Sequence, residues 1–124
     1  MGRINYHNRY FAPVVNAANG EVDSTTVFHY RQQDNIVWAT YTGGGVRWGA
    51  LTALVDADDC LDMRYSHVNT AGTLMTGRCR SVPEVLADGR VRLHEDWQWT
   101  CGDESCGQSV VEEIHTPYAG SQKL

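Results

Sequence analysis

Apolar and aromatic residues recur at every second position in short segments of this chain, and Gly, Asn and Asp separate the segments. A spacing of two places alternate side chains on opposite faces of a β-strand, whereas an amphipathic helix needs apolar residues three and four apart. The pattern predicts strands at about residues 4–12, 26–32, 36–42, 46–55, 61–69, 73–82, 90–100 and 107–116. One helical turn is expected at 83–86, before the Asp88-Gly89 turn.

The connections between these segments are short and carry turn residues, such as Asn19-Gly20 and Asp34-Asn35. Short connections leave no room for crossover helices, so successive strands must be antiparallel neighbours. We therefore expect an all-β fold, an eight-stranded antiparallel up-and-down barrel, because closure removes exposed sheet edges. A sandwich of two packed sheets is the alternative.

The chain of 124 residues has the length of one domain. We expect a single β-barrel domain over 1–124, with a structured core at about 4–116 and a flexible tail at 117–124. A composition of 42% hydrophobic and 20% charged residues argues against global disorder.

Charged residues identify the outer face of most strands, and the residues that alternate with them should point inward. In the segment 46–55, for example, an outward Arg47 predicts that Trp48, Ala50, Thr52 and Leu54 face the interior. The strand at 36–42 is ambiguous because Trp38 and Tyr41 fall on opposite faces, and the last strand does not show which face is inside. The inward residues that we expect to bind a ligand are Phe28, Tyr30, Gln32, Trp48, Met63, Tyr65, His67, Glu95, Trp97 and Trp99.

This set combines aromatic walls with a few polar groups, which is the composition of a small-molecule pocket. An unpaired carboxylate such as Glu95 is costly to bury in a purely structural core. The sequence thus predicts binding of a small apolar or aromatic molecule inside the barrel. Three plainer interpretations stay open: Glu95 satisfied by neighbouring donors, His67 solvated at the barrel mouth, and Trp97 and Trp99 as core packing.

An enzyme on the same barrel is the second hypothesis. A carboxyl group in an aromatic pocket has a raised pKa and can transfer protons near neutral pH. Glu95, His67 and Tyr30 would then be the catalytic residues of a cofactor-independent isomerase, cyclase or dehydratase. A third hypothesis is a protein-interaction module whose interior is merely filled.

The net charge and the sequence motifs argue against several classes of binding partner. The net charge of −5 disfavours nucleic-acid binding. The chain has no signal-peptide pattern and no apolar run of the ~20 residues that a membrane helix needs, so we expect a cytoplasmic protein without membrane contact. We expect no cofactor and no metal, although the spacing of Cys101 and Cys106 leaves free thiols, a disulfide and half a zinc site open. A homodimer also stays open.

Several stretches resemble a family of small bacterial proteins of about this length: Phe28-His29-Tyr30-Arg31-Gln32, Trp38-Ala39-Thr40-Tyr41, Leu61-Asp62-Met63-Arg64-Tyr65 and Arg92-Leu93-His94-Glu95-Asp96-Trp97-Gln98-Trp99. The resemblance covers about residues 5–116. Members of that family often carry the name N-acetylglutamate synthase. The activity does not transfer to this chain, because the usual acetyltransferases need an Arg/Gln-x-x-Gly-x-Gly/Ala loop and a following helix, and the sequence has neither. As an architecture, the eight-strand meander is similar to lipocalin, fatty-acid-binding and avidin-like barrels.

Overall fold

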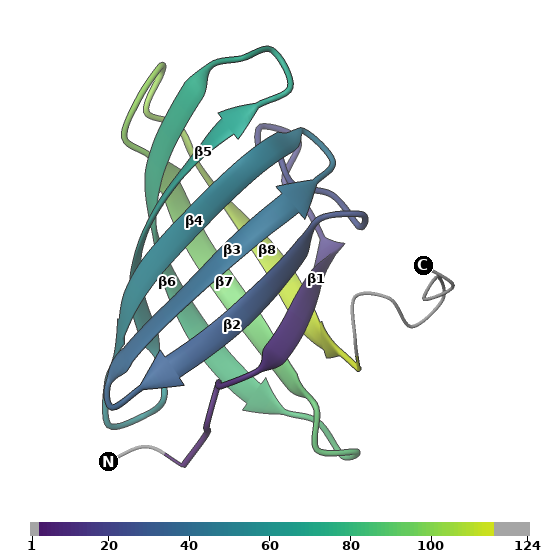
Figure 1. Ribbon diagram of the computed structural model, residues 1–124, viewed down its shortest axis with the longest axis vertical. Coiled ribbons are helices and arrows are strands. Elements are labelled where there is room, and N and C mark those ends of the chain that lie inside the picture. The colour runs from purple at the N-terminus through teal and green to yellow at the C-terminus, as the bar shows by residue number, and fades with distance from the viewer. Residues whose placement is uncertain (1–2, 116–124) are drawn as a thin grey trace.

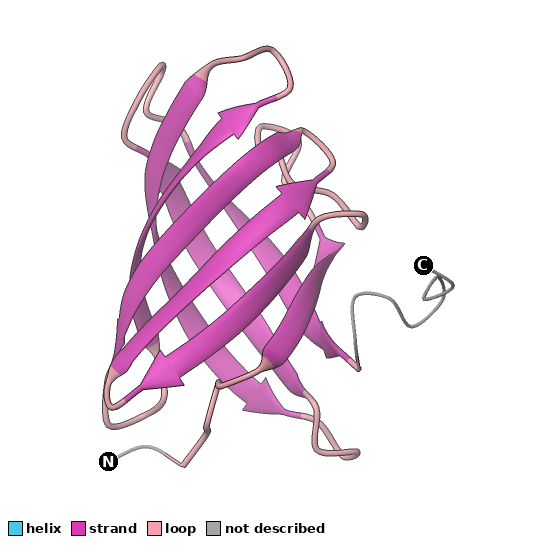
Figure 2. Cartoon of the chain, in the orientation of Figure 1, coloured by secondary structure: helices cyan, strands magenta, loops and turns pink. Residues whose placement is uncertain are grey.

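Eight strands form the framework of the computed structural model, which describes residues 3–115 (Figure 1). The strands are β1 (Arg9–Val15), β2 (Val27–Gln33), β3 (Ile36–Gly43), β4 (Val46–Val55), β5 (Leu61–Asn69), β6 (Leu74–Val85), β7 (Val91–Trp99) and β8 (Cys106–Ile114). Figure 2 shows that loops alone connect them. The described residues contain no helix long and apolar enough to cross a membrane.

Each strand pairs antiparallel with its neighbour along the chain, and β1 also pairs with β8, so the sheet closes on itself. The register at the closing seam places Tyr10 opposite Ile114 and Ala12 opposite Glu112. The predicted closed, eight-stranded barrel is confirmed, and the two-sheet alternative is wrong. Closure satisfies both edges of the sheet, which an open meander would leave exposed.

The two ends of the barrel are built differently. At the lower end in Figure 1, residues 4–8 run across the opening, where Tyr6 is fully buried. The Tyr6 hydroxyl donates to the Asp59 carbonyl at 2.6 Å, and the Tyr6 amide donates to Gln32 Oε1 at 2.8 Å. Above Tyr6 the interior is filled by buried side chains, namely Phe11, Tyr30, Val37, Leu61, Val91, Leu93 and Val111. This packed half of the interior forms a floor for whatever lies above it.

The predicted inward face of β4 is wrong. Ala50 is half-buried and Thr52, Leu54 and Trp48 are exposed, Trp48 with 54% of its surface, whereas the intervening Gly49, Leu51 and Ala53 are buried. The cause is a β-bulge near the start of the strand, where Val46 pairs with Asn69 but Trp48 pairs with Val68. A bulge places two consecutive residues, Arg47 and Trp48, on the same side and so reverses the alternation after it.

Two boundaries also differ from the prediction. The expected helical turn at 83–86 is wrong, because β6 continues to Val85 and Pro83 pairs with Leu93. The first strand begins at Arg9 rather than at residue 4, because residues 4–8 form the segment that crosses the lower end.

All four cysteines are free thiols in the structure. The expected flexible tail at 117–124 lies outside the described residues.

Candidate functional site

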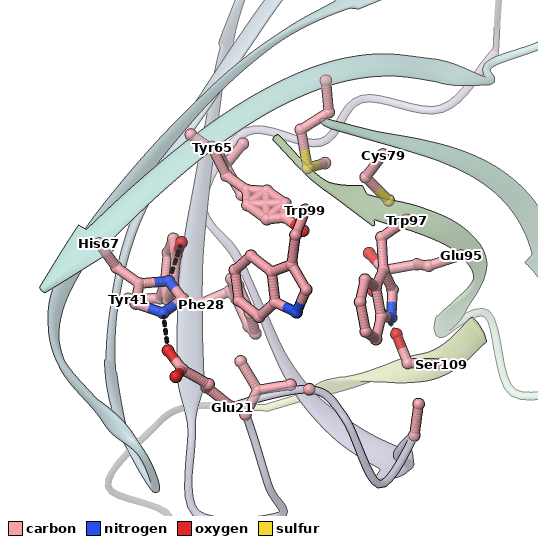
Figure 3. Close-up of a pocket in the computed structure, with 15 residues that line it drawn as sticks. Glu21, Phe28, Tyr41, Tyr65, His67, Cys79, Glu95, Trp97, Trp99 and Ser109 are labelled. Atoms are coloured by element: carbon pink, nitrogen blue, oxygen red, sulfur yellow. Dashed lines mark hydrogen bonds and ion pairs between the residues drawn. The ribbon is translucent and has the colours of Figure 1, made fainter. Parts of the chain in front are cut away.

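The upper half of the barrel interior contains a cavity instead of packed side chains (Figure 3). Its free volume is about 60 Å³, room for a few water molecules. It is lined by side chains from the loop between β1 and β2 and from the inner faces of the strands: Ala17, Gly20, Glu21, Val22, Phe28, Tyr41, Leu51, Met63, Tyr65, His67, Cys79, Glu95, Trp97, Trp99 and Ser109.

Glu95 lies deep in this cavity, just above the packed floor. Trp99 lies at the loop end of β7, and Glu95 is four residues deeper in the barrel, about 13 Å away along an extended strand. Ser81 and Ser109 are its cross-strand partners on either side, and their hydroxyls donate to the two carboxylate oxygens at 3.3 and 3.1 Å. Burial raises the pKa of Glu95 to about 7, although the two serine hydroxyls act against the shift. The group can therefore carry or lose a proton near neutral pH.

A chain of hydrogen bonds closes the other end of the cavity. His67, which is only 3% exposed, lies 2.7 Å from Glu21 Oε1 through its Nε2 and 2.9 Å from the Tyr41 hydroxyl through its Nδ1. The second oxygen of Glu21 accepts from the Asn69 side chain at 2.9 Å. An Nε2-H tautomer satisfies both contacts, because the ring then donates to the carboxylate and accepts from the phenol. His67 is thus a positioned partner of the loop, with both ring nitrogens in use.

The loop that carries Glu21, residues 16–26, folds over the mouth of the barrel, and hydrogen bonds attach it to neighbouring loops and strand ends. The Gly45 amide donates to the Glu21 carbonyl at 2.9 Å, and the Trp99 indole donates to the Asn19 carbonyl at 3.0 Å. The Asn19 side chain donates to Ser105 Oγ and the Cys106 carbonyl, both at 3.0 Å. These hydrogen bonds hold the loop across the mouth of the cavity. We call residues 16–26 the covering loop.

Aromatic rings form a continuous wall between the mouth and Glu95. Trp99 makes edge-to-face contacts with Trp97, Tyr65 and His67, with ring centroids 5.6–5.8 Å apart. On the opposite side Phe28 stacks on Tyr41 at 4.6 Å. Two inner-face glycines make room for the wall, because a Cβ at Gly77 would collide with the Tyr65 ring and one at Gly107 with the Trp97 ring. The sequence thus places small residues where neighbouring strands supply large ones.

The structure brings together seven of the residues expected to bind a ligand: Phe28, Met63, Tyr65, His67, Glu95, Trp97 and Trp99. Tyr30 is buried in the floor beneath the cavity, and Gln32 lies at the lower end, where it binds Tyr6. The inward placement of Trp48 is wrong because of the β4 bulge. Alternation missed four lining residues: Glu21, Tyr41, Leu51 and Ser109. Glu21 lies in a loop and Leu51 on the bulged strand. Tyr41 and Ser109 lie on strands whose inner face the sequence does not show.

A second, wider hollow of about 550 Å³ lies against the outer face of β5 to β8. Charged side chains of this hollow bind neighbours on the same face: Arg64 pairs with Asp62 at 2.7 Å, and Arg78 donates to Gln98 at 2.8 Å. Residues 3–115 hold no group of three or more His, Cys, Asp or Glu side chains placed to bind a metal ion. The interior cavity is therefore the better candidate for a site.

Fold and cavity together define a closed eight-stranded β-barrel that is packed at one end and hollow and aromatic at the other. Comparison with family models finds a match to an avidin-like protein over residues 4–114. The chain therefore belongs to the avidin-like protein family. This supports the expected resemblance to a family of small β-barrels and has no bearing on the synthase name.

Among solved structures, apo shwanavidin is similar to this chain, with a TM-score of 0.59 and 9% sequence identity over 92% of this chain and 100% of that one. At that identity the likeness shows the fold alone. No curated protein matches the sequence significantly.

Proposed function

We propose that this protein binds a small apolar or aromatic molecule in the cavity beneath the covering loop. The observation that carries the proposal is a hollow interior walled by aromatic rings, with one carboxyl group at its base and a hydrogen-bonded loop at its mouth. A core that served stability alone would be packed, as the lower half of this barrel is. A protein-interaction module with a filled core would not have such a cavity.

Family membership supports the proposal, since avidins bind small molecules such as biotin. The free volume of about 60 Å³ is smaller than the roughly 150 Å³ of a cavity that binds benzene, so a ring ligand would require the covering loop or an aromatic side chain to move. A bicyclic ligand such as biotin would require a larger movement. We include in the proposal a cytoplasmic location and a monomer or homodimer that engages neither nucleic acid nor membrane.

Intrinsic fluorescence tests the proposal, because Trp97 and Trp99 line the cavity whereas Trp48 lies outside on β4. Titration with single-ring aromatics and with biotin should quench or shift the emission. Trp97→Phe should reduce that response, and Trp48→Phe, the matched control on the outer face, should leave it intact. An absence of response to every compound, or a response that only Trp48→Phe removes, would refute interior binding.

Proton-transfer catalysis is a second candidate, favoured by the pKa of about 7 at Glu95. His67 is a weaker candidate base because both its ring nitrogens are bonded, and Tyr30 lies below the cavity, so the hypothesis rests on Glu95. If the protein is an isomerase, it should accelerate hydrogen–deuterium exchange at the α-carbon of small aryl ketones, and Glu95→Gln should abolish the acceleration. Equal exchange with and without the wild-type protein would argue against catalysis on such substrates.

A further inference from the structure

The carboxyl group at the base of the cavity has no cationic partner within the described part of the chain. The ion pairs of residues 3–115 join other carboxylates to arginines and histidines, and none includes Glu95. The cavity lining contains no arginine or lysine. Buried carboxylates are ordinarily paired, because leaving the charge unpaired in a low-dielectric interior is costly. The site therefore lacks a positive charge that a ligand could supply.

The hydrogen-bonding capacity of Glu95 is only partly used. An ionised carboxylate offers about four lone pairs, and Glu95 accepts one hydroxyl at each oxygen. Both serines are cross-strand neighbours on β6 and β8, so they approach from the sides. Glu95 lines the cavity together with Trp97 and the other aromatic rings (Figure 3). A planar donor with two N–H groups would match two carboxylate oxygens in a bidentate contact.

The aromatic wall favours the same ligand. Rings attract cations through the negative charge on their faces, and the attraction is strongest where water is excluded. Trp97, Trp99 and Tyr65 line the same cavity as Glu95, and Trp97 is its next inward neighbour on β7. Glu21 adds a second carboxylate at the mouth. The charged groups that line the cavity are thus acidic, apart from His67, which is engaged by Glu21.

We propose that the ligand is a small planar cation with N–H donors on an aromatic body, of the aryl amidine or aminopyridine class, whose charged end pairs with Glu95. This inference rests on the proposed function, since it names the ligand class for the same cavity. It predicts that positive charge, not only aromatic surface, determines affinity.

The proposal has a proton linkage. Burial raises the pKa of Glu95 to about 7, so the free protein holds a proton there at pH 6 that a cationic ligand must displace. The other titratable groups around Glu95 are Tyr30, Tyr41, Tyr65 and Cys79, whose pKa values burial also raises, so they stay protonated between pH 6 and pH 8. His67 and Glu21 face the cavity from its mouth.

Calorimetric titration with benzamidine and with benzamide, its neutral isostere, tests the inference. At pH 8 we expect benzamidine to bind the wild-type protein at least ten-fold more tightly than benzamide. Glu95→Gln should reduce the preference to less than two-fold, while Asp96→Asn, the exposed neighbour on β7, should preserve it. The benzamidine affinity of the wild type should rise about ten-fold from pH 6 to pH 8, as the ionised fraction of a group with pKa about 7 rises. Benzamide affinity should change much less.

The outcomes separate the two proposals. If benzamide binds as tightly as benzamidine, or if Glu95→Gln keeps the preference, the cationic ligand class is wrong and interior binding stands. If neither compound nor any other aromatic probe binds, both proposals fail. If Glu95→Gln does not fold, the pH series on the wild type decides: a benzamidine affinity that is flat or that changes in parallel with benzamide overturns the inference.

Discussion

Glu95 and Asp96 are consecutive residues on β7 that face opposite sides of the barrel. Asp96 is exposed and accepts a hydrogen bond from Gln108 at 2.7 Å, whereas Glu95 faces the cavity between two serines. Neighbouring carboxyl groups thus meet very different surroundings, because alternate side chains of one strand lie on opposite faces of the sheet. The difference gives Glu95 an effect on stability that Asp96 lacks.

We predict that wild-type stability falls as the pH rises through the range where Glu95 ionises. The folded-state pKa of about 7 lies above the ordinary value of 4.5, so the stability is fully present below pH 4.5 and is lost as the pH rises to about 7. The loss is about 3 kcal/mol. Urea unfolding at pH 4 and pH 8 measures it. Glu95→Gln should remove that part of the pH dependence and Asp96→Asn should not; a Glu95→Gln protein with the wild-type pH profile would show that the carboxyl group is not desolvated.

For single residues, the sequence predicted which side chains point inward where a strand alternates regularly, and it failed elsewhere. Met63, Tyr65 and His67 on β5, and Glu95, Trp97 and Trp99 on β7, follow directly from their charged neighbours. Tyr41 and Ser109 lie on strands with no unambiguous charged face. Glu21 lies in a loop, where no periodicity exists to assign a direction.

Among the connecting elements, the covering loop is attached to the barrel by the contact between Glu21 and the His67 ring. Glu21, which is 25% exposed, forms a largely buried pair with His67, whereas Glu84 forms a pair of similar length, 2.9 Å, with His94 on the exposed outer surface. Exposed pairs contribute little because water competes for both partners. A buried hydrogen-bonded pair costs more to disrupt, because one member is left unsatisfied.

We therefore predict that Glu21→Ala loosens the covering loop and destabilises the protein by about 1–3 kcal/mol, whereas Glu84→Ala changes stability by less than about 0.5 kcal/mol. The Gly45 amide, which donates to the Glu21 carbonyl, should exchange with deuterium at least ten-fold faster in Glu21→Ala. The Val55 amide, which donates to Asn35 at the other end of the barrel, should exchange at the wild-type rate. Wild-type protection of Gly45 in Glu21→Ala would contradict this role for the pair.

The β4 bulge shows what alternation cannot detect. The segment at 46–55 was predicted with correct boundaries and the wrong face, because a single extra residue reverses every later position. The sequence gives no separate signal that Arg47 and Trp48 lie on the same side. Only the pairing with Asn69 and Val68 on β5 fixes the bulge, and that pairing depends on the whole sheet.

The interior of the barrel is packed with side chains at one end and contains a cavity at the other. Tyr6 completes the packed end, where its ring lies 6.2 Å from that of Tyr30 and its hydroxyl binds Asp59. The alternation pattern predicted closure correctly, because eight antiparallel strands without crossovers can satisfy their edges in a barrel. It could not show which part of the interior is empty, since packing depends on side-chain volumes from several strands at once.

We predict that the packed end stabilises the fold without affecting the cavity. Tyr6→Ala should lower the free energy of unfolding by about 3–5 kcal/mol, because it leaves a void in a buried cluster. Tyr6→Phe should lower it by about 1 kcal/mol through the lost hydrogen bond. Ligand affinity should be unchanged in Tyr6→Phe, since Phe11, Tyr30 and Leu93 separate Tyr6 from the cavity. Denaturant unfolding and calorimetric titration measure the two effects, and a parallel loss of affinity in Tyr6→Phe would contradict the separation.

The most direct test of interior binding follows the four tryptophan indole N–H signals by nuclear magnetic resonance during titration with benzamidine, benzamide and indole. Trp97 and Trp99 line the cavity, whereas Trp38 and Trp48 alternate with buried residues on the outer face of β3 and β4. We predict that the Trp97 and Trp99 signals shift with at least one of the probes while those of Trp38 and Trp48 stay in place. Shifts confined to Trp38 or Trp48, or no shift with any probe at millimolar concentration, would contradict ligand binding inside the barrel.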